Sequence, residues 1–443
     1  MTILTISIIL LLGIFALMAV GVPLAFAAGS LAMVVAYLKF GLPVLAIAHK
    51  TVYGLATEYS FLSVPMFILM ASLLERSRLA RDLYDALNSI FGRIRGGIGY
   101  VTLVISVLLA AISGIIGGEI VLLGLVALPQ MLRLKYDRNL AIGIVCAGGS
   151  LGTMIPPSIV LIVYGLTANV SVHQLFLGSF LPGFLLAAFY LVYIAIRCWL
   201  DPSAAPKPAE TRQVPFSWPV FLRGVLPTAI LIFTVFGCIY GGITSITEAA
   251  NIAVGMTLVI IAVRGELSLP MLAQALTQTL RACGIILWVT FGAAVMVAIY
   301  NLSSGQRFVT ELILGLNISP LLTILLMMTI FIVLGMFMDW IGILLLCMPI
   351  FVPIVAALGY DLVWFGVLFS VTMQVSFLSP PFGPAAFYLR SVAPPRHHPP
   401  RDLQGSVAIH PDPAVHAGPA AGFPRDLASP SQSRTLMCSG AFR

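Results

Sequence analysis

Apolar runs of about twenty residues recur along this chain from its first residues to about Val392. A helix of that length crosses the hydrocarbon core of a bilayer, because it rises about 1.5 Å per residue and the core is about 30 Å thick. The runs lie at 2–20, 22–38, 54–74, 97–116, 118–134, 173–199, 221–241, 243–263, 283–301, 318–338 and 340–358. This repetition predicts an all-α polytopic membrane protein.

The shortage of charge supports the same interpretation. Of the 443 residues, 60% are apolar and only 9% are charged, whereas soluble domains carry about 25% charged residues. So few charged side chains cannot cover a water-facing surface, which excludes a soluble enzyme. The net charge of +7 comes mostly from basic residues in short breaks between the runs, as expected of orienting loops. No basic stripe indicates a nucleic-acid partner, and no catalytic motif indicates an enzyme.

Two further apolar stretches, 139–168 and 362–392, are each interrupted by a Pro-Pro pair. Proline removes a backbone donor and disfavours helix at the residue before it, so both helices should break at membrane depth. Freed carbonyl groups are tolerated there only when they are buried in protein or face an aqueous cavity. We therefore expect one re-entrant hairpin near 139–168 and another near 362–392. The alternative is a turn held by neighbouring helices, with no ligand.

The two halves of the chain resemble each other. A shift of 224 residues superposes Gly118 on Gly342, Pro129 on Pro353, Tyr136-Asp137 on Tyr360-Asp361, and Pro156-Pro157 on Pro380-Pro381. We expect a first membrane repeat at 1–200, a polar, Pro-rich linker at 201–219, and a second membrane repeat at 220–392. Repeats with interrupted helices at matching positions are typical of secondary transporters. Charged amphipathic stretches at 75–96 and, more weakly, 264–282 are expected to lie in the membrane interface.

Three acidic residues fall inside the apolar segments: Glu119, Glu248 and Asp339. A carboxylate in the membrane is costly and is a functional candidate by default. The alternative is a carboxylate that backbone or hydroxyl donors satisfy and that fixes a helix break. Together with the break residues Pro157, Ser158, Pro380 and Pro381, these acids are the candidates for the substrate path.

Several segments together resemble the large membrane subunit of tripartite ATP-independent periplasmic (TRAP) transporters, the DctM-like family. They read Gly-Val-Pro-Leu-Ala-Phe-Ala (21–27), Ser-Gly-Ile-Ile-Gly-Gly-Glu (113–119), Leu-Pro-Gln-Met-Leu (128–132), Gly-Ser-Leu-Gly-Thr-Met-Ile-Pro-Pro-Ser (149–158), Gly-Ile-Thr-Ser-Ile-Thr-Glu-Ala-Ala (242–250), Gly-Met-Phe-Met-Asp (335–339) and Ser-Phe-Leu-Ser-Pro-Pro-Phe-Gly (376–383). The resemblance covers roughly residues 1–395.

The resemblance implies an inverted-repeat, elevator-type importer with two re-entrant helical hairpins, of the ion-transporter superfamily type, in the bacterial inner membrane. Such a protein works with a small DctQ-like membrane subunit and a periplasmic DctP-like binding protein. Sodium ions would drive the uptake of an organic acid, and no organic cofactor is expected. The alternatives are another secondary transporter that acts alone and an ion channel. Which acid is carried does not follow from the sequence.

The resemblance also implies two sodium sites, matched by motif. The first comprises Ser113, Gly152, Ile155 and Pro156, and the second comprises Gly335, Ser376, Ser379 and Phe382. Carbonyl and hydroxyl oxygens suit a hard cation such as sodium. This chain departs from the family at the first site, because Ser-Gly-Ile-Ile stands where many members have Ser-Gly-Ser-Ser. Ile116 therefore supplies no side-chain oxygen.

From Ala393 onward the composition changes abruptly, with nine prolines in 51 residues. Such a segment lacks the apolar residues for a packed core, and we expect residues 393–443 to form a disordered tail. A reading-frame shift just after Pro395 explains this change, and the alternative is a genuine cytoplasmic tail. The frameshift predicts that another frame past codon 395 encodes an apolar stretch of about 20 residues.

Overall fold

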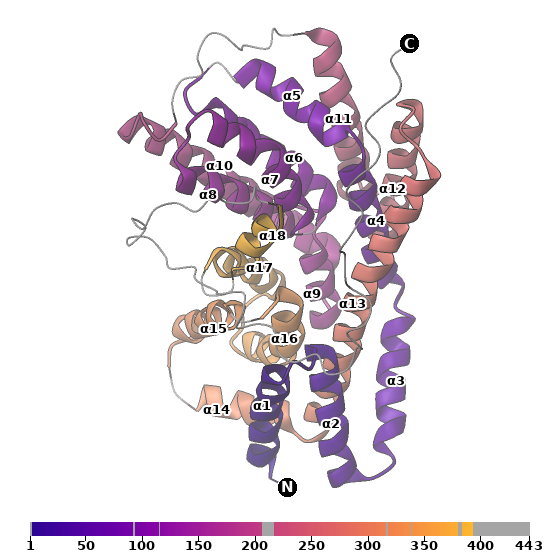
Figure 1. Cartoon of the computed structure of the whole chain (residues 1–443). Coiled ribbons are helices and arrows are strands. Elements are labelled where there is room, and N and C mark those ends of the chain that lie inside the picture. The colour runs from indigo at the N-terminus through magenta and orange to yellow at the C-terminus, as the bar shows by residue number, and fades with distance from the viewer. Residues whose placement is uncertain are drawn as a thin grey trace, which may run out of the picture. The chain divides into compact units, whose positions relative to one another are not determined.

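Regular structure in this protein is helical wherever the computed structural model describes it, which is at residues 2–91, 94–114, 116–205, 217–315, 318–336, 338–379 and 383–392 (Figure 1). The elements of the first half are α1 (Ile3–Ala19), α2 (Leu24–Phe40), α3 (Val44–Ala56), η1 (Tyr59–Leu62), α4 (Ser63–Arg76), α5 (Leu79–Phe91), α6 (Gly97–Ser113), α7 (Gly118–Arg133), α8 (Arg138–Ser150), η2 (Leu151–Thr153), α9 (Ile159–Ala168) and α10 (Val172–Leu200). Those of the second half are α11 (Trp218–Tyr240), α12 (Ile246–Val263), α13 (Leu269–Leu302), α14 (Gly305–Leu314), α15 (Pro320–Gly335), α16 (Trp340–Ala357), α17 (Leu362–Leu378) and α18 (Pro384–Val392).

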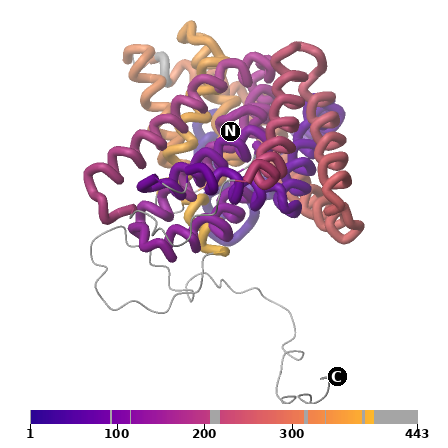
Figure 2. Tube along the Cα trace, turned by 90° about the horizontal axis from the view of Figure 1, so that it is seen from above, coloured from indigo at the N-terminus to yellow at the C-terminus, as the bar shows by residue number. Residues whose placement is uncertain are grey.

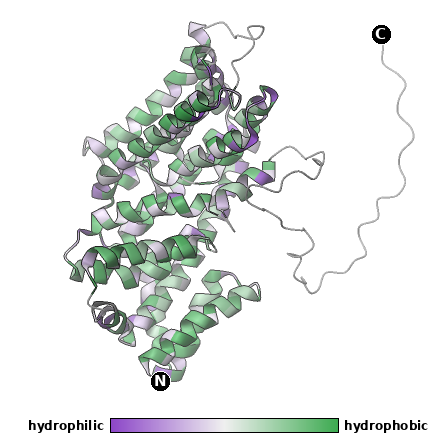
Figure 3. Cartoon of the chain, turned by 90° about the vertical axis from the view of Figure 1, so that its left-hand side faces the viewer, coloured by the Kyte–Doolittle hydropathy of each residue, from purple (hydrophilic) through white to green (hydrophobic). Residues whose placement is uncertain are grey.

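Six helices in the described part of the chain are long and apolar enough to cross a membrane: Tyr59–Arg76, α10, α11, α12, α13 and α16. Shorter apolar helices accompany them, and Figure 3 shows hydrophobic residues along most of the helical surface. Only 22% of the α11 window is buried within the protein, against 61% of the α16 window, so α11 faces lipid and α16 lies inside. These features confirm the predicted all-α polytopic membrane protein.

Some helices differ from the apolar runs. The amphipathic stretch at 75–96 forms α5, as expected, but 264–282 is not a separate interfacial helix. Its greater part joins the following run in the 34-residue helix α13. Helices α3 and α14 were not predicted, because charged residues such as Lys50 and Arg307 interrupt their apolar character.

The helix boundaries repeat between the halves. After the shift of 224 residues, α6 matches α15, α7 matches α16, α8 matches α17 and α9 matches α18, each to within a few residues. The packing repeats as well, because α16 contacts α9 of the first half while α18 contacts α7. Orange and yellow helices of the second half lie among the purple helices of the first (Figure 2). This exchange of helices supports an internal duplication. The exact limits of the repeats and of the linker stay a prediction, and residues 206–216 and 393–443 lie outside the described residues.

In the first half, the helices that pack side by side are not the two that the predicted hairpin near 139–168 would pair. Helices α6 and α7 pack against each other across the short connection 114–117, and α15 and α16 do the same. In the stretch 139–168, α8 and α9 instead follow one another and make little mutual contact. In the second half α17 does contact α18. The Pro-Pro pair thus marks the helix break, while the neighbouring helices decide which segments pair.

The most extensive helix crossing joins α2 to α13. Gly29 and Gly292 meet there, and a Cβ atom at Gly292 would lie 2.1 Å from the Ala25 carbonyl oxygen. Small residues allow helix backbones to approach closely where lipid gives no hydrophobic drive for association. Helix α13 also packs on α4, which in turn contacts α12. This framework borders the elements that contain the helix breaks.

Candidate cation-binding sites at the two helix breaks

The first helix break lies between α8 and α9. Helix α8 ends at Ser150, the η2 turn follows, and Ile159 begins α9 after the two prolines. Every residue from 151 to 158 is buried. The Ser158 hydroxyl donates to the Thr153 carbonyl oxygen at 2.6 Å. The irregular backbone is therefore enclosed by protein, as a non-helical segment at membrane depth requires.

The α6–α7 connection lies directly against this break. Ile159 N–H donates to the Gly114 carbonyl oxygen at 3.2 Å. Gly114 has φ +63°, and a Cβ atom there would lie 2.3 Å from the Pro157 carbonyl oxygen. Both the left-handed backbone and the close approach require glycine. The predicted break residues Pro157 and Ser158 thus form the surface on which this connection rests.

Three of the predicted residues meet at this point. The Ser113 hydroxyl, at the end of α6, donates to Glu119 Oε1 in the first turn of α7. Gly152 lies beside the same carboxylate, because a Cβ atom there would be 2.6 Å from Glu119 Oε1. Ile155 and Pro156 are buried in the same turn, and Ile155 lies against Gly183 of α10. The structure thus brings together Ser113, Gly152 and Glu119.

The Glu119 side chain is only 3% exposed, and its Oε2 atom has no hydrogen-bond partner. The α7 dipole favours a negative charge in the first turn by at most about 2 kcal/mol. Burial of an ion costs several kcal/mol, so the dipole alone does not balance it. Glu119 thus places a buried carboxylate oxygen without a partner beside the first break.

The second break follows α17. Ser376 is buried, and its hydroxyl donates to the Phe331 carbonyl oxygen of α15 at 3.4 Å. Gly335 ends α15, and a Cβ atom there would lie 2.4 Å from Ser376 Oγ. The Ser379 hydroxyl donates to the Val375 carbonyl oxygen at 2.7 Å. Gly335, Ser376 and Ser379 thus lie at the end of two packed helices, while Pro380, Pro381 and Phe382 lie outside the described residues.

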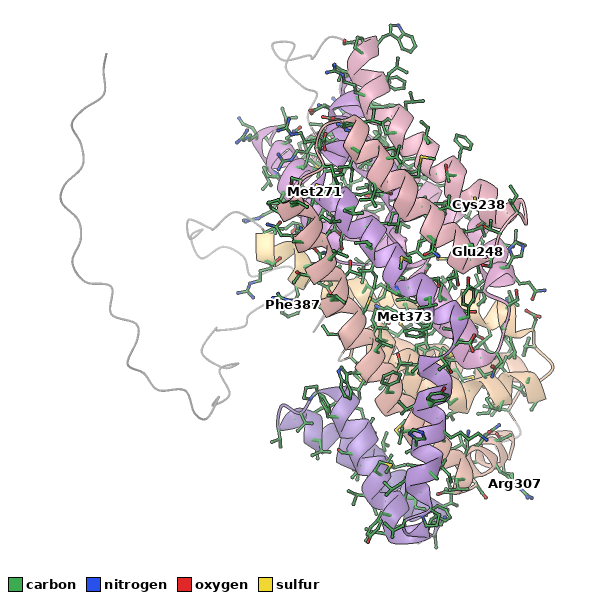
Figure 4. All side chains as sticks on the ribbon, turned by 90° about the vertical axis from the view of Figure 1, so that its right-hand side faces the viewer. Cys238, Glu248, Met271, Arg307, Met373 and Phe387 are labelled. Carbon is green, nitrogen blue, oxygen red and sulfur yellow. The ribbon has the colours of Figure 1, made fainter. Side chains whose placement is uncertain are left out.

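The remaining acids have different positions. Asp339 is the N-cap residue of α16, in the connection that follows Gly335. Glu248 is exposed at the start of α12, where its Oε2 accepts the Ser245 N–H at 2.8 Å and completes a capping box. Figure 4 shows Glu248 at the margin of the helices, whereas Met373, near the second break, lies buried within them. Helix α12 packs mainly on α4 and α11, so Glu248 does not join either break.

One residue that sequence reasoning missed links the two halves. Gln374 of α17 is buried, and its Nε2 donates to Thr153 Oγ1 at the first break, at 2.7 Å. An uncharged amide within an apolar helix was the available signal. Among the described residues, no cluster of three or more His, Cys, Asp or Glu side chains could hold a metal ion. The donors gathered at the breaks are oxygen atoms, which suit a hard cation.

Duplicated halves, interrupted helices and buried oxygen donors define a membrane transport protein. The family model for the tripartite ATP-independent periplasmic transporter, DctM component, matches residues 11–410. The chain belongs to this family and is its large permease subunit, a multi-pass protein of the bacterial inner membrane.

Individual relatives agree over most of their length. The C4-dicarboxylate TRAP transporter large permease protein DctM of Pseudomonas aeruginosa is 29% identical over 336 residues, covering 76% of this chain and 78% of the relative. Its namesake in Vibrio cholerae is 27% identical, with coverages of 86% and 88%. The 2,3-diketo-L-gulonate TRAP transporter large permease protein YiaN of Escherichia coli is 26% identical, with coverages of 85% and 87%.

Proposed function

We propose that this chain is the translocating subunit of a sodium-driven importer of organic acids. The observation that supports this best is the pair of matched helix breaks, each with buried hydroxyl or carboxylate oxygens beside a close helix contact. Half-helix ends and broken backbone at such positions suit a small cation and an anionic substrate together. Among the relatives are C4-dicarboxylate and 2,3-diketo-L-gulonate transporters, which are organic-acid carriers.

Sodium ions would occupy the two breaks. Ser113, Gly152, Ile155 and Pro156 would surround the first ion, and Gly335, Ser376, Ser379 and Phe382 the second. Asp339, Pro157, Ser158, Pro380 and Pro381 would border the substrate path between them. No organic cofactor is needed, because the sodium gradient supplies the driving force.

The transport cycle would be of the elevator type. The paired helices α6–α7 and α15–α16, with the broken segments beside them, would move as a unit along the framework of α2, α4, α12 and α13. Contacts between α16 and α9 and between α18 and α7 tie elements of both halves together and support this division. Two partners would complete the importer: a small DctQ-like membrane subunit and a periplasmic DctP-like binding protein.

The decisive experiment reconstitutes the full chain in liposomes with its DctQ-like small subunit and DctP-like binding protein. The acid that co-purifies with the binding protein is the substrate. Uptake should require an inward sodium gradient and both partners. A potassium gradient should not substitute for the sodium gradient. Uptake without any sodium gradient would contradict the sodium-driven mechanism. Full uptake by this chain alone, with free substrate, would contradict the tripartite assembly and favour a transporter that acts alone.

A further inference from the structure

A hydrogen bond between side chains of the two halves reaches the first helix break. It runs from Gln374 Nε2, near the end of α17, to Thr153 Oγ1 in the η2 turn, at 2.7 Å. Both side chains are buried, Gln374 at 3% exposed and Thr153 at 1%. Gln374 precedes Ser376 by two residues, and Thr153 directly follows Gly152. One bond thus connects close neighbours of the two proposed cation sites.

The other bonds of Thr153 fix the direction of this one. The Thr153 hydroxyl donates its single hydrogen to the Ser150 carbonyl oxygen at 2.8 Å, so it accepts from the Gln374 amide. The Thr153 carbonyl oxygen in turn accepts the Ser158 hydroxyl at 2.6 Å. Thr153 is therefore bonded to both ends of the irregular segment between α8 and α9, and Gln374 adds a bond from the other half.

Helix α17 is bonded to the first half at its other end as well. The Tyr164 hydroxyl of α9 donates to the Leu362 carbonyl oxygen, at the start of α17, at 2.7 Å. Helix α17 also contacts α8, α9 and α10. The helix that ends at the second break is therefore held along its length by the segments that form the first.

Stability alone does not account for an amide at this place. Gln374 Oε1 is buried and accepts no hydrogen bond from the described residues, and burial of a polar atom without a partner is costly. The residue that corresponds to Gln374 in the first half is Ser150. Its hydroxyl donates instead to the Ala147 carbonyl oxygen of its own helix, at 2.9 Å. Of these two matched positions, only the one on α17 links the halves.

We propose that Gln374 is a positioning residue that couples the two cation sites. By holding Thr153, it sets the neighbouring backbone of Gly152 and Ile155 relative to Ser376. An ion that orders one break then lowers the cost of ordering the other. Such coupling is reciprocal and makes sodium binding positively cooperative. The proposal rests on the sodium-driven function and adds how its two ions act together.

The test measures equilibrium binding of radioactive sodium to the purified full chain in detergent, with choline chloride keeping the ionic strength constant. Gln374→Met removes the amide but keeps a side chain of similar size. Thr153→Val removes the acceptor, whereas Thr153→Ser retains it. The matched control is Thr372→Val, because Thr372 is also buried on α17 but its hydroxyl makes its bonds within the second half.

The wild-type Hill coefficient should exceed 1 and fall toward 1 in Gln374→Met, which should still bind both ions. The half-saturating sodium concentration should rise about two- to tenfold, the range that loss of one hydrogen bond gives. Thr153→Val should have the same effect, and combining it with Gln374→Met should add little, since both remove one interaction. Thr153→Ser and Thr372→Val should keep the wild-type binding curve.

Three results overturn the proposal and leave the sodium-driven function standing: a wild-type Hill coefficient of 1, an unchanged curve in Gln374→Met, and loss of a bound ion in that variant. The last would make Gln374 part of a site instead of a link between two. If Gln374→Met does not fold, equal curves for Thr153→Val and Thr153→Ser overturn the proposal equally. Wild-type protein that binds no sodium refutes the sodium-driven function itself.

Discussion

Each helix break has a close contact between a glycine and side-chain oxygens, but the two breaks place the glycine on opposite sides of that contact. At the first, the broken segment contributes a glycine, Gly152, and the α6–α7 pair contributes the side-chain oxygens of Ser113 and Glu119. At the second, the glycine is Gly335 on the paired helices, and the oxygens belong to Ser376 and Ser379 beside the break.

The two halves share a close approach at the break rather than particular residues. Gly152 corresponds to Ser376, and Ala111 corresponds to Gly335. One partner must be small so that the other can place an oxygen at the contact. The side-chain oxygens also differ, because those at the first contact include the Glu119 carboxylate and those at the second are the hydroxyls of Ser376 and Ser379.

The largest expected effect is at the first break. Gly114→Ala would force a left-handed alanine into the Pro157 carbonyl group, which costs about 3 kcal/mol or more. The control is Gly143→Ala in α8, where no atom lies within 4 Å of the added methyl group. Size-exclusion profiles and unfolding temperatures in detergent compare the two. Normal folding of Gly114→Ala would show that the two elements do not pack as described.

The second break should respond most strongly in transport. Ser379→Ala and Asp339→Asn should reduce sodium-dependent uptake about tenfold or more while the amount of protein in the membrane changes little. Ser379→Ala removes one oxygen from the proposed second cation site, which weakens ion binding to about that extent. Asp339→Asn removes a carboxylate from the proposed substrate path. Uptake assays are normalised to membrane protein by immunoblotting. Wild-type uptake with an unchanged sodium dependence in both variants would remove these residues from the site.

Two glycine variants test whether the glycine lies on opposite sides of the contact at the two breaks. Gly335→Ala would place a methyl group 2.4 Å from Ser376 Cβ, close to the rigid backbone, and overpacking of this kind costs about 1–3 kcal/mol. Gly152→Ala meets the end of the flexible Glu119 side chain, so its loss of stability should be smaller. The unfolding temperatures of the two variants are measured in choline chloride, without sodium. A larger loss of stability in Gly152→Ala than in Gly335→Ala would contradict the comparison.

The smallest effect concerns Glu248, outside both breaks. Ser245→Ala removes a helix cap and should cost about 1 kcal/mol. Glu248→Gln should cost less, because an amide oxygen still accepts the Ser245 N–H. Neither should alter the sodium concentration that half-saturates uptake. A changed sodium dependence in Glu248→Gln would return this residue to the substrate path.

Much of this arrangement was predictable from local rules. Pro156-Pro157 fixes the first break because proline cannot continue a helix there, and the same rule predicts that α17 ends by Ser379. The capping role of Glu248 was also readable, because Ser-Ile-Thr-Glu at 245–248 fits the capping-box pattern.

Pairing between helices was not predictable in the same way. Apolar runs give the length of a helix but not its neighbour, so the side-by-side position of α6 and α7 came from the structure. The contact of Glu119 with Gly152 likewise joins residues of different helices, and only tertiary packing brings them together.

The most direct test of two cation sites counts the sodium ions bound per chain. Equilibrium binding of radioactive sodium to the purified full chain should saturate at two ions. Ser113→Ala should leave the ion of the second break, and the double variant Ser376→Ala with Ser379→Ala should leave the ion of the first. Absence of saturable binding, or a count that neither set of substitutions changes, would contradict the account.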